Sequence, residues 1–514
     1  MAKRSVSIIL ALVLLLSAFA FSGAAVAEEE PVTVVLAQDS DPTTLDPHRT
    51  SGDQGGRVYM NICETLTIFD GEWKLQPLLA ESWEQESETS WIFHLREGIE
   101  FSNGEPFNAE AVIWNLDRGA SKEYPRQAME YITYYDHAEA IDDYTVRIVT
   151  NQYCGLIPEY MSDVPMLAPA YSAEIGEEAI GQDIVGTGPY VLTSWEHDQQ
   201  ITLTAREDYW QGEPAVDVYV IRTIPEQATQ LAELLSGNID IALDVNFEYL
   251  DMLEGNDNVT TQSRLERRVL YIGFNTLDWC ATEALKDKRV RQAMNYAVDV
   301  DAIIETIMGG YGTRLESLWR HDFPGYEEGL VEGYTYDPDK ARELLAEAGY
   351  ADGFDVTMQV NTLSASKFTE IAQAVAYYLG EVGINVTLEN LDTATARSIT
   401  IEGQDQEKVS GLFTWSWASK PGLCDSWMTG IIMSDGMTSY NVIEGYDELC
   451  SEILALHDEE AKIPLYQELQ QKLVDDPPFL YLFQQNSIYA ISSRLDWDVN
   501  SNCYILAFDM AVKA

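Results

Sequence analysis

Basic residues are scarce in this chain. It has 31 Lys and Arg against 85 Asp and Glu in 514 residues, a formal net charge of -54. Proteins that bind nucleic acid neutralise phosphates with clustered Lys and Arg, so the imbalance excludes nucleic acid as a partner and disfavours adhesion to anionic membranes. The acidic residues are spread along the chain rather than gathered in blocks, which favours a well-solvated surface over a device for capturing cations.

Motifs for metal binding and catalysis are also lacking. The six histidines never approach one another at metal-ligand spacing, and HExxH and CxxC are absent, so we expect no metal and no cofactor. There is no GxSxG, Walker or GxGxxG motif. Residues 364–367 match a bare SxxK pattern, but the SDN and KTG motifs of the corresponding serine enzymes are missing. We therefore predict a protein that is not an enzyme, and keep a secreted α/β hydrolase as the alternative.

Long apolar segments are absent after the first thirty or so residues. Near the start, two basic residues precede an apolar stretch that ends in Ala25-Val26-Ala27, a small-x-small cleavage pattern. We predict a signal peptide at residues 1–27 and therefore an exported protein, periplasmic or extracellular. An uncleaved anchor helix is the alternative, because residues 8–26 are nearly long enough to span a bilayer.

Cysteine is also rare, with six residues in the whole chain. An even number in an exported protein permits disulfides, although the spacing leaves many pairings open. The favoured pair is Cys424 with Cys450, because these two flank one continuous segment.

The rest of the chain alternates short strand patterns with helical ones, which predicts a mixed α/β protein of roughly two to four domains. Asp287, Asp299 and Asp337 each precede an apolar pattern of helical period and are expected to cap helices. Short runs rich in β-branched or aromatic residues predict strands at residues 32–36, 190–192, 201–203, 218–221 and 386–388.

One run, from Leu79 to Arg118, combines several of these signals. Residues 91–95 alternate apolar and polar side chains as a half-buried strand does, and Asn103-Gly104 tolerates the positive φ of a tight turn. Asn108 follows and can cap a helix with an apolar side formed by alanine, isoleucine, tryptophan and leucine.

The order of these elements, together with further landmarks, resembles the extracytoplasmic solute-binding proteins of peptide- and nickel-type ABC importers. The landmarks are short motifs in the family's order that cover nearly all of the chain after the predicted signal peptide: Thr44-Leu45-Asp46-Pro47-His48, Cys63-Glu64-Thr65-Leu66, Gly186-Thr187-Gly188-Pro189-Tyr190, Ser236-Gly237-Asn238-Ile239-Asp240, Asp287-Lys288-Arg289-Val290-Arg291-Gln292 and Asp476-Pro477-Pro478.

The resemblance implies a type II periplasmic-binding-protein fold, in which two α/β lobes close over a solute and a further domain is inserted in lobe one. On this numbering, the implied lobes are residues 28–70, 185–265 and 485–514 for lobe one, 71–184 for the insertion and 266–484 for lobe two. It also implies a monomeric receptor that binds a small-molecule or peptide solute, shifts between open and closed states, and docks on permease subunits in the membrane.

Aromatic and polar side chains gather in two segments that suit a small-molecule cleft. Trp415-Ser416-Trp417 and the pair Tyr481 and Phe483 offer apolar contact beside groups that fix orientation. The alternative for the two tryptophans is that they lie on one face of a strand and fill a core.

The segment after Trp417 departs from the peptide-binding pattern. Oligopeptide- and dipeptide-binding members have an acidic residue here that pairs with the peptide amino terminus, whereas this chain has Lys420. A lysine would repel an ammonium group and favour a carboxylate, although Asp425 could substitute for the missing acid. An oligosaccharide therefore stays open as an alternative to a peptide. Asp53 and Gln54 complete the candidate ligand-binding set.

Overall fold

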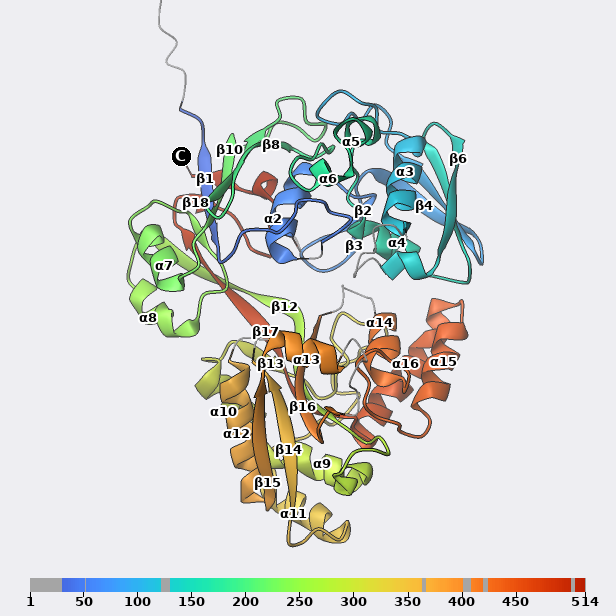
Figure 1. Cartoon of the computed structure of the whole chain (residues 1–514), viewed down its shortest axis with the longest axis vertical. Coiled ribbons are helices and arrows are strands. Elements are labelled where there is room, and N and C mark those ends of the chain that lie inside the picture. The colour runs from blue at the N-terminus through green and yellow to red at the C-terminus, as the bar shows by residue number, and fades with distance from the viewer. Residues whose placement is uncertain are drawn as a thin grey trace, which may run out of the picture.

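The computed structural model describes residues 30–50, 52–121, 130–362, 367–400, 408–418, 424–500 and 504–513. The predicted signal peptide lies outside these residues. Two α/β bodies are joined by two long strands, β12 (Val259–Phe274) and β17 (Phe479–Ser492), which pair antiparallel and run from one body into the other (Figure 1). Among the described residues, no helix has the length and apolar character needed to span a membrane.

The described strands include one sheet of eleven that runs through both bodies in the order β15-β14-β16-β12-β17-β11-β1-β10-β9-β8, with β13 paired to β17. In the first lobe β1 is parallel to β10 and β11, and the others are antiparallel. The strands of this lobe are β1 (Thr33–Gln38), β8 (Tyr190–Glu196), β9 (Gln200–Ala205), β10 (Val218–Thr223) and β11 (Ile241–Ala242). The strands predicted in this part of the chain are confirmed.

Side-chain alternation along β1 explains how helices cover both faces of the first lobe's sheet. Val34 and Leu36 point into one core with α2 (Asp53–Ile62), whereas Ala37 points into the other core with α7 (Gln227–Leu235). A strand buried on both faces in this way is typical of a parallel sheet within an α/β layer.

The second lobe repeats this layering. Its parallel strands are β14 (Phe354–Asn361), β15 (Ile384–Leu391) and β16 (Leu412–Ala418), with the short β13 (Gly312–Arg314) on β17. Helices on one face are α9 (Lys288–Ala297), α10 (Val300–Ile307), α11 (Pro338–Glu347) and α12 (Phe368–Glu381). The other face packs against α13 (Thr393–Thr400), α14 (Asp425–Trp427), α15 (Tyr446–Ala455) and α16 (Glu459–Asp475).

The predicted helix caps of this lobe are confirmed. The side chains of Asp287, Asp299 and Asp337 each accept a hydrogen bond from a backbone N–H in the first turn of α9, α10 and α11. Each cap satisfies one of the donors that a helix start leaves without an intrahelical partner.

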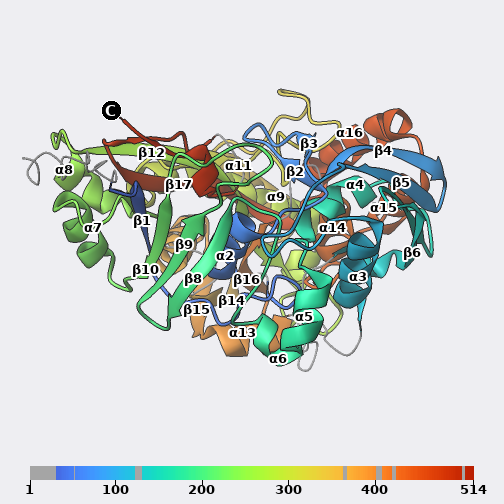
Figure 2. The same cartoon turned by 90° about the horizontal axis from the view of Figure 1, so that it is seen from above.

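A smaller sheet and its helix form a separate body beside the first lobe, shown in cyan and light blue in Figures 1 and 2. The sheet has the order β4-β5-β7-β6 and packs with α3 (Ala109–Ala120) around a core of its own. Its strands are β4 (Ala80–Ser87), β5 (Ser90–Leu95), β6 (Tyr135–Asp142) and β7 (Thr145–Thr150), preceded by the hairpin of β2 (Thr67–Phe69) and β3 (Leu75–Pro77). We call it the small domain; the limits 71–184 stay a prediction.

The sequence prediction for residues 79–118 is confirmed within the small domain. β5 forms where the alternation predicts it, Gly104 has φ 84, and the Asn108 side chain accepts a hydrogen bond from the Ala111 N–H at 3.1 Å. All three signals are local, so they need no knowledge of the rest of the fold.

The predicted Cys424–Cys450 disulfide is wrong. Cys450 is a buried free thiol on α15 that packs among apolar side chains, and burial raises its pKa to about 12. Cys63, Cys154 and Cys280 are also buried free thiols, and Cys503 lies outside the described residues. These cysteines pack as small apolar groups, a role that spacing in the sequence does not distinguish from pairing.

Candidate functional site

The parallel strands of each lobe end at the side that faces the other lobe. In the second lobe β15 leads directly into α13, which Figure 1 shows at the edge nearest the first lobe. In the first lobe β11 leads into Asp244, which shares a cavity with residues of the second lobe. Open α/β sheets bind ligands in the crevice outside the carboxyl ends of their parallel strands. The space between the lobes is therefore the candidate site.

The lobes touch on the side of the crossing strands. Lys367 Nζ donates to Glu248 Oε1 at 2.7 Å across the gap. Gly309 lies so close to the ring of Phe247 that a Cβ atom at this position would be 2.4 Å from ring carbons. Both contacts join η3 (Phe247–Tyr249) of the first lobe to helix ends of the second.

A second set of contacts lies on the far side, where the small domain meets the second lobe. Tyr153 stacks on His457 with ring centroids 3.8 Å apart, and its hydroxyl donates to the His457 carbonyl at 3.0 Å. Trp73, between β2 and β3, stacks on His321 at 5.6 Å. The lobes are thus held together on both sides of the space between them.

Asp244 is the most unusual acidic residue of this space. Its φ of 49° is in the left-handed region, and the Gln227 side chain holds its backbone carbonyl at 2.8 Å. Ser487 on β17 donates to Asp244 Oδ1 at 2.8 Å. The nearby protein partly desolvates this carboxyl and raises its pKa above the usual value against the opposing charge of Arg57, although 62% of the side-chain surface is still exposed.

Beside Asp244 is a cavity of about 70 Å³. Both lobes and the crossing strand β17 line it, with Phe247 from the first lobe, Met308 and Lys367 from the second, and residues 485–488 from β17. Within the described part of the chain, two buried oxygens of this lining, Gln485 Oε1 and Asn486 Oδ1, have no hydrogen-bond partner. Buried acceptors of this kind are ready to receive donors from a ligand or from water.

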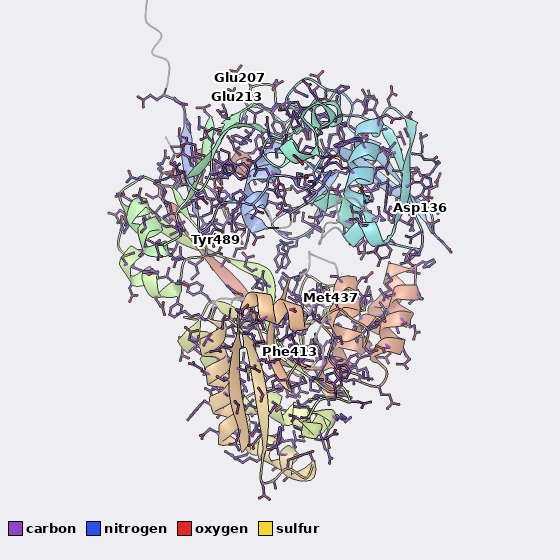
Figure 3. The ribbon with its side chains drawn as sticks, in the orientation of Figure 1. Asp136, Glu207, Glu213, Phe413, Met437 and Tyr489 are labelled. Carbon is purple, nitrogen blue, oxygen red and sulfur yellow. The ribbon has the colours of Figure 1, made fainter. Side chains whose placement is uncertain are left out.

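The crossing strands add a further polar group. Tyr489 on β17 donates to Glu266 Oε1 on β12 at 3.4 Å, and the guanidinium of Arg264 lies 5.5 Å from the centre of the Tyr489 ring. Figure 3 shows Tyr489 where the strands leave the first lobe. Charged groups of both signs therefore meet at the crossing.

Comparison with known proteins places the chain in one family. The sequence model of the bacterial extracellular solute-binding proteins, family 5 Middle, matches residues 74–436. The chain belongs to this family. It is a substrate-binding receptor of an ABC importer, and its two lobes are those of the family fold.

Individual relatives agree in length and architecture. The chain is 28% identical over 479 residues to heme-binding protein A of Haemophilus influenzae, covering 87% of this chain and 85% of that one. It is 29% identical over 477 residues to glutathione-binding protein GsiB of Pectobacterium atrosepticum, covering 90% of each. The structure of HbpA2 from Haemophilus parasuis superposes with a TM-score of 0.82 at 23% identity, covering 94% of this chain and 100% of that one. The relatives are named for binding and not for catalysis.

The tryptophan segment of this family 5 protein lies on β16. Trp415 is 8% exposed and packs in the core against α14 and α15, and Trp417 lies on the same face at the edge of that core, over Gly430. Between them, Ser416 Oγ accepts a hydrogen bond from Arg268 at 2.9 Å. Asp425, half-buried, is the first residue of α14. Lys420 lies outside the described residues.

The other predicted residues are divided between the lobes. The Tyr481 hydroxyl donates to the Leu473 carbonyl at 2.6 Å, and Phe483 is fully buried in the opposite core, so neither is open to a solute in this conformation. Asp53 is exposed at the start of α2, and Gln54 donates to Asp39 at 3.3 Å. The structure brings Asp53 close enough to Asp244 to raise the pKa of that carboxyl. Whether these residues bind solute stays a prediction.

Sequence reasoning missed Asp244 and Arg57. Arg57 follows the predicted Asp53 by four residues, so both lie on the same side of α2, one turn apart. An arginine one helical turn after a predicted site residue, in a chain poor in basic residues, was the signal that could have identified Arg57. Asp244 had no comparable signal, because its role depends on strands distant in the sequence.

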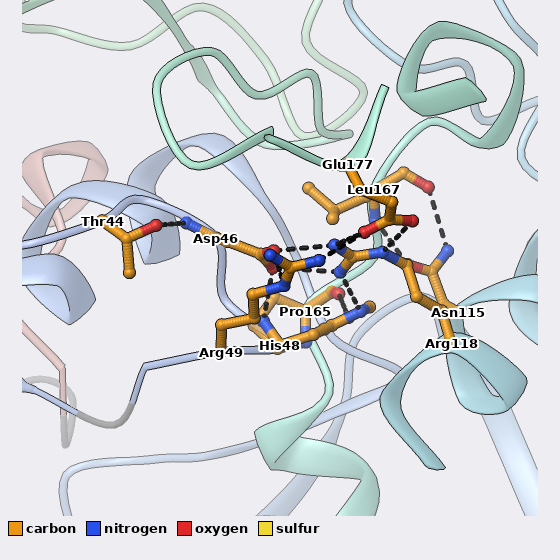
Figure 4. A network of polar contacts seen from close by, with 9 residues as sticks. All are labelled: Thr44, Asp46, His48, Arg49, Asn115, Arg118, Pro165, Leu167 and Glu177. Atoms are coloured by element: carbon orange, nitrogen blue, oxygen red, sulfur yellow. Dashed lines mark hydrogen bonds and ion pairs between the residues drawn. The ribbon is translucent and has the colours of Figure 1, made fainter. Parts of the chain in front are cut away.

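The first landmark motif forms a structural junction rather than part of the crevice (Figure 4). Arg118 on α3 donates to both oxygens of Asp46, at 3.0 and 2.7 Å, and to Glu177 at 2.7 Å. Its guanidinium also lies 3.0 Å from His48 Nδ1. Burial by itself raises the pKa of Asp46, but the hydrogen bond and charge of Arg118 outweigh it and hold that pKa below its usual value. The junction ties the small domain to the first lobe.

The contacts on the far side yield a test of lobe closure. Tyr153→Ala removes both the stacking on His457 and the hydrogen bond to its carbonyl. We expect the solute-free protein to open. The substitution removes a stabilising contact from the closed state, and it removes nothing from an open state in which the two residues are apart. Small-angle X-ray scattering without solute would show a larger radius of gyration than for wild type. Tyr377→Ala, a change at a side chain that is 65% exposed, is the control; equal radii in all three proteins would contradict the expectation.

Proposed function

We propose that this receptor works as a monomer, captures a small polar solute or peptide between its lobes without transforming it, and delivers it to permease subunits at the membrane. The observation that supports this most is the crevice between the lobes, which has polar groups at the ends of parallel strands and interlobe contacts on both sides. A closed state that binds solute better than the open state is what a transport signal requires.

A ligand screen tests the proposal. Peptides, sugars, amino acids and metal chelates would be added singly to the purified protein, and thermal unfolding would be followed. A solute that binds only the folded state raises the melting temperature in proportion to its concentration over Kd. Mass spectrometry of material that co-purifies with the protein gives a second measurement. Absence of stabilisation by every member of the panel, and of any co-purified solute, would contradict the proposal.

Trp417→Ala tests whether the tryptophan segment contacts the solute. Trp417 is only partly buried at the edge of the core, so part of its side chain is accessible to solvent. Loss of an aromatic contact is expected to weaken binding by about tenfold while the protein stays folded, measured by calorimetric titration and circular dichroism. Trp279→Ala, at a tryptophan that is 45% exposed, is the matched control. Loss of the fold in Trp417→Ala would instead assign Trp417 to the core.

A further inference from the structure

We propose that Asp244 and Arg57 together bind an α-amino acid head group of the solute, meaning an ammonium and a carboxylate on the same carbon. The inference rests on the proposed function and adds the chemical class of its ligand. Asp244 receives the ammonium, and Arg57 receives the carboxylate.

The spacing of the two side chains suits a ligand whose two charges lie across both of them better than it suits a structural ion pair. Arg57 Nη2 and Asp244 Oδ2 are 3.8 Å apart and make no hydrogen bond. In the same lobe, Arg494 holds Asp240 Oδ2 at 2.6 Å. A paired arginine and carboxylate normally close to such a distance, so the wide pair is set by the positions of α2 and β11.

Arg57 has its donors available. Its side chain is 16% exposed, and within the described part of the chain its guanidinium donates no hydrogen bond and has only Asp244 as a carboxylate within 4.0 Å. Guanidinium presents a planar set of donors that matches a carboxylate in two parallel hydrogen bonds. A largely buried arginine without such bonds is prepared for an anion that arrives from solution.

One oxygen of Asp244 accepts a hydrogen bond, and the other is within 3.8 Å of Arg57 without one. Ser487 occupies Oδ1, whereas Oδ2 faces Arg57. An ammonium group has three donors. Asp244 Oδ2 can accept one, and the unpartnered oxygens of Gln485 and Asn486 line the cavity beside it as further acceptors. Lys367, which also lines the cavity, is already paired with Glu248.

The surrounding charges select against simpler ions. Glu266 accepts a hydrogen bond from Tyr489 on the crossing strands, and Asp53 lies one turn before Arg57 on α2. These two further carboxylates of the neighbourhood repel a solute that carries only carboxylates. Arg57 repels a solute that carries only an ammonium group. A head group that carries both charges on one carbon satisfies both residues at once.

Four probes separate the possibilities. L-Glutamate and glutathione carry the head group, N-acetylglutathione lacks its ammonium, and Ala-Ala carries its two charges on different residues. We expect calorimetric titration to show binding of L-glutamate or glutathione, and binding of N-acetylglutathione and Ala-Ala to be weaker by about 30-fold or more. Equal binding of N-acetylglutathione, or binding of Ala-Ala or of a sugar alone, would overturn the assignment and leave the receptor function standing. No binding of any solute would count against both.

Two variants locate the head group. Asp244→Asn keeps the shape and tolerates the left-handed backbone, so the fold is expected to survive. Asp244→Asn and Arg57→Gln should each weaken binding of the bound probe by about 30-fold or more, with the melting temperature of the solute-free protein unchanged. Asp251→Asn and Arg222→Gln, outside the cavity, are the matched controls. Unchanged affinity in either site variant would overturn the proposal.

Discussion

Arg118→Ala is expected to lower the free energy of unfolding by about 3 kcal/mol, because a buried carboxylate loses two hydrogen bonds and keeps Arg49, whose Nε lies 3.1 Å from Asp46 Oδ2, as its charged partner. Asp46 is 1% exposed and depends on Arg118 for two hydrogen bonds, and His48 lies in the same junction. Urea denaturation followed by circular dichroism measures the loss. Arg147→Ala is the control, since Arg147 pairs with Glu86 and Glu139 on the exposed face of the small domain; a small change is expected there.

The decrease in unfolding free energy caused by Arg118→Ala should depend on pH in a defined direction. The pKa of Asp46 is depressed in the folded protein, so its ionised form contributes stability above the unfolded value, and this contribution is lost as pH falls through the folded pKa. Once Asp46 is protonated, Arg118→Ala leaves no unpaired charge there. The difference between the variant and wild type is therefore expected to shrink below about pH 4. A constant difference from pH 7 to pH 3, or equal losses in Arg118→Ala and Arg147→Ala, would contradict this account.

Gly186→Ala is expected to cost about 3 kcal/mol or more, because the backbone of α2 lies where the new methyl group would be. A Cβ at Gly186 would be 2.1 Å from the Ile62 carbonyl oxygen and 2.7 Å from Cys63 Cα. The segment cannot retreat easily, since the Gly188 N–H donates to the same Ile62 carbonyl at 2.8 Å. The glycines of this landmark motif are thus required by close packing of two backbones.

Gly380→Ala is the matched control for that substitution. Gly380 lies inside α12, and a Cβ there would have no neighbour within 4 Å. Alanine is the better helix former by about 1 kcal/mol, so a gain in stability is expected. Thermal and urea unfolding should show a loss of stability for Gly186→Ala and a gain for Gly380→Ala, each relative to wild type. A Gly186→Ala protein as stable as wild type would refute the packing argument.

Local features of the fold were predictable from the sequence, and long-range ones were not. Caps such as Asp299 and Asn108 act within one turn of their own helix, so three or four residues specify them. The family order of motifs gave the two lobes. It could not say that Trp415 would lie in a core, because both faces of β16 are covered by helices distant in the sequence.

The candidate site was even less predictable from the sequence. Arg57 and Asp244 are far apart in the chain and meet only because α2 packs beside the strand that precedes Asp244. Ser487, which orients Asp244, comes from a third segment near the end of the chain. Single-sequence patterns have periods of a few residues, so a site assembled from three segments leaves no such pattern.

The pairing of β12 with β17 limits how the two lobes can move relative to each other. Two paired strands make a stiffer connection than a single strand, and we expect bending where their register is irregular, between Leu265 and Tyr271, because the hydrogen-bond ladder is interrupted there. Displacement during such bending grows with distance from the pivot. Asp244 is hydrogen-bonded to Ser487 on β17 and is expected to move little, whereas Tyr153 and His457 lie on the far side of the space between the lobes and are expected to separate most. We therefore expect the contact between Tyr153 and His457 to break first when the lobes open and to form last when they close.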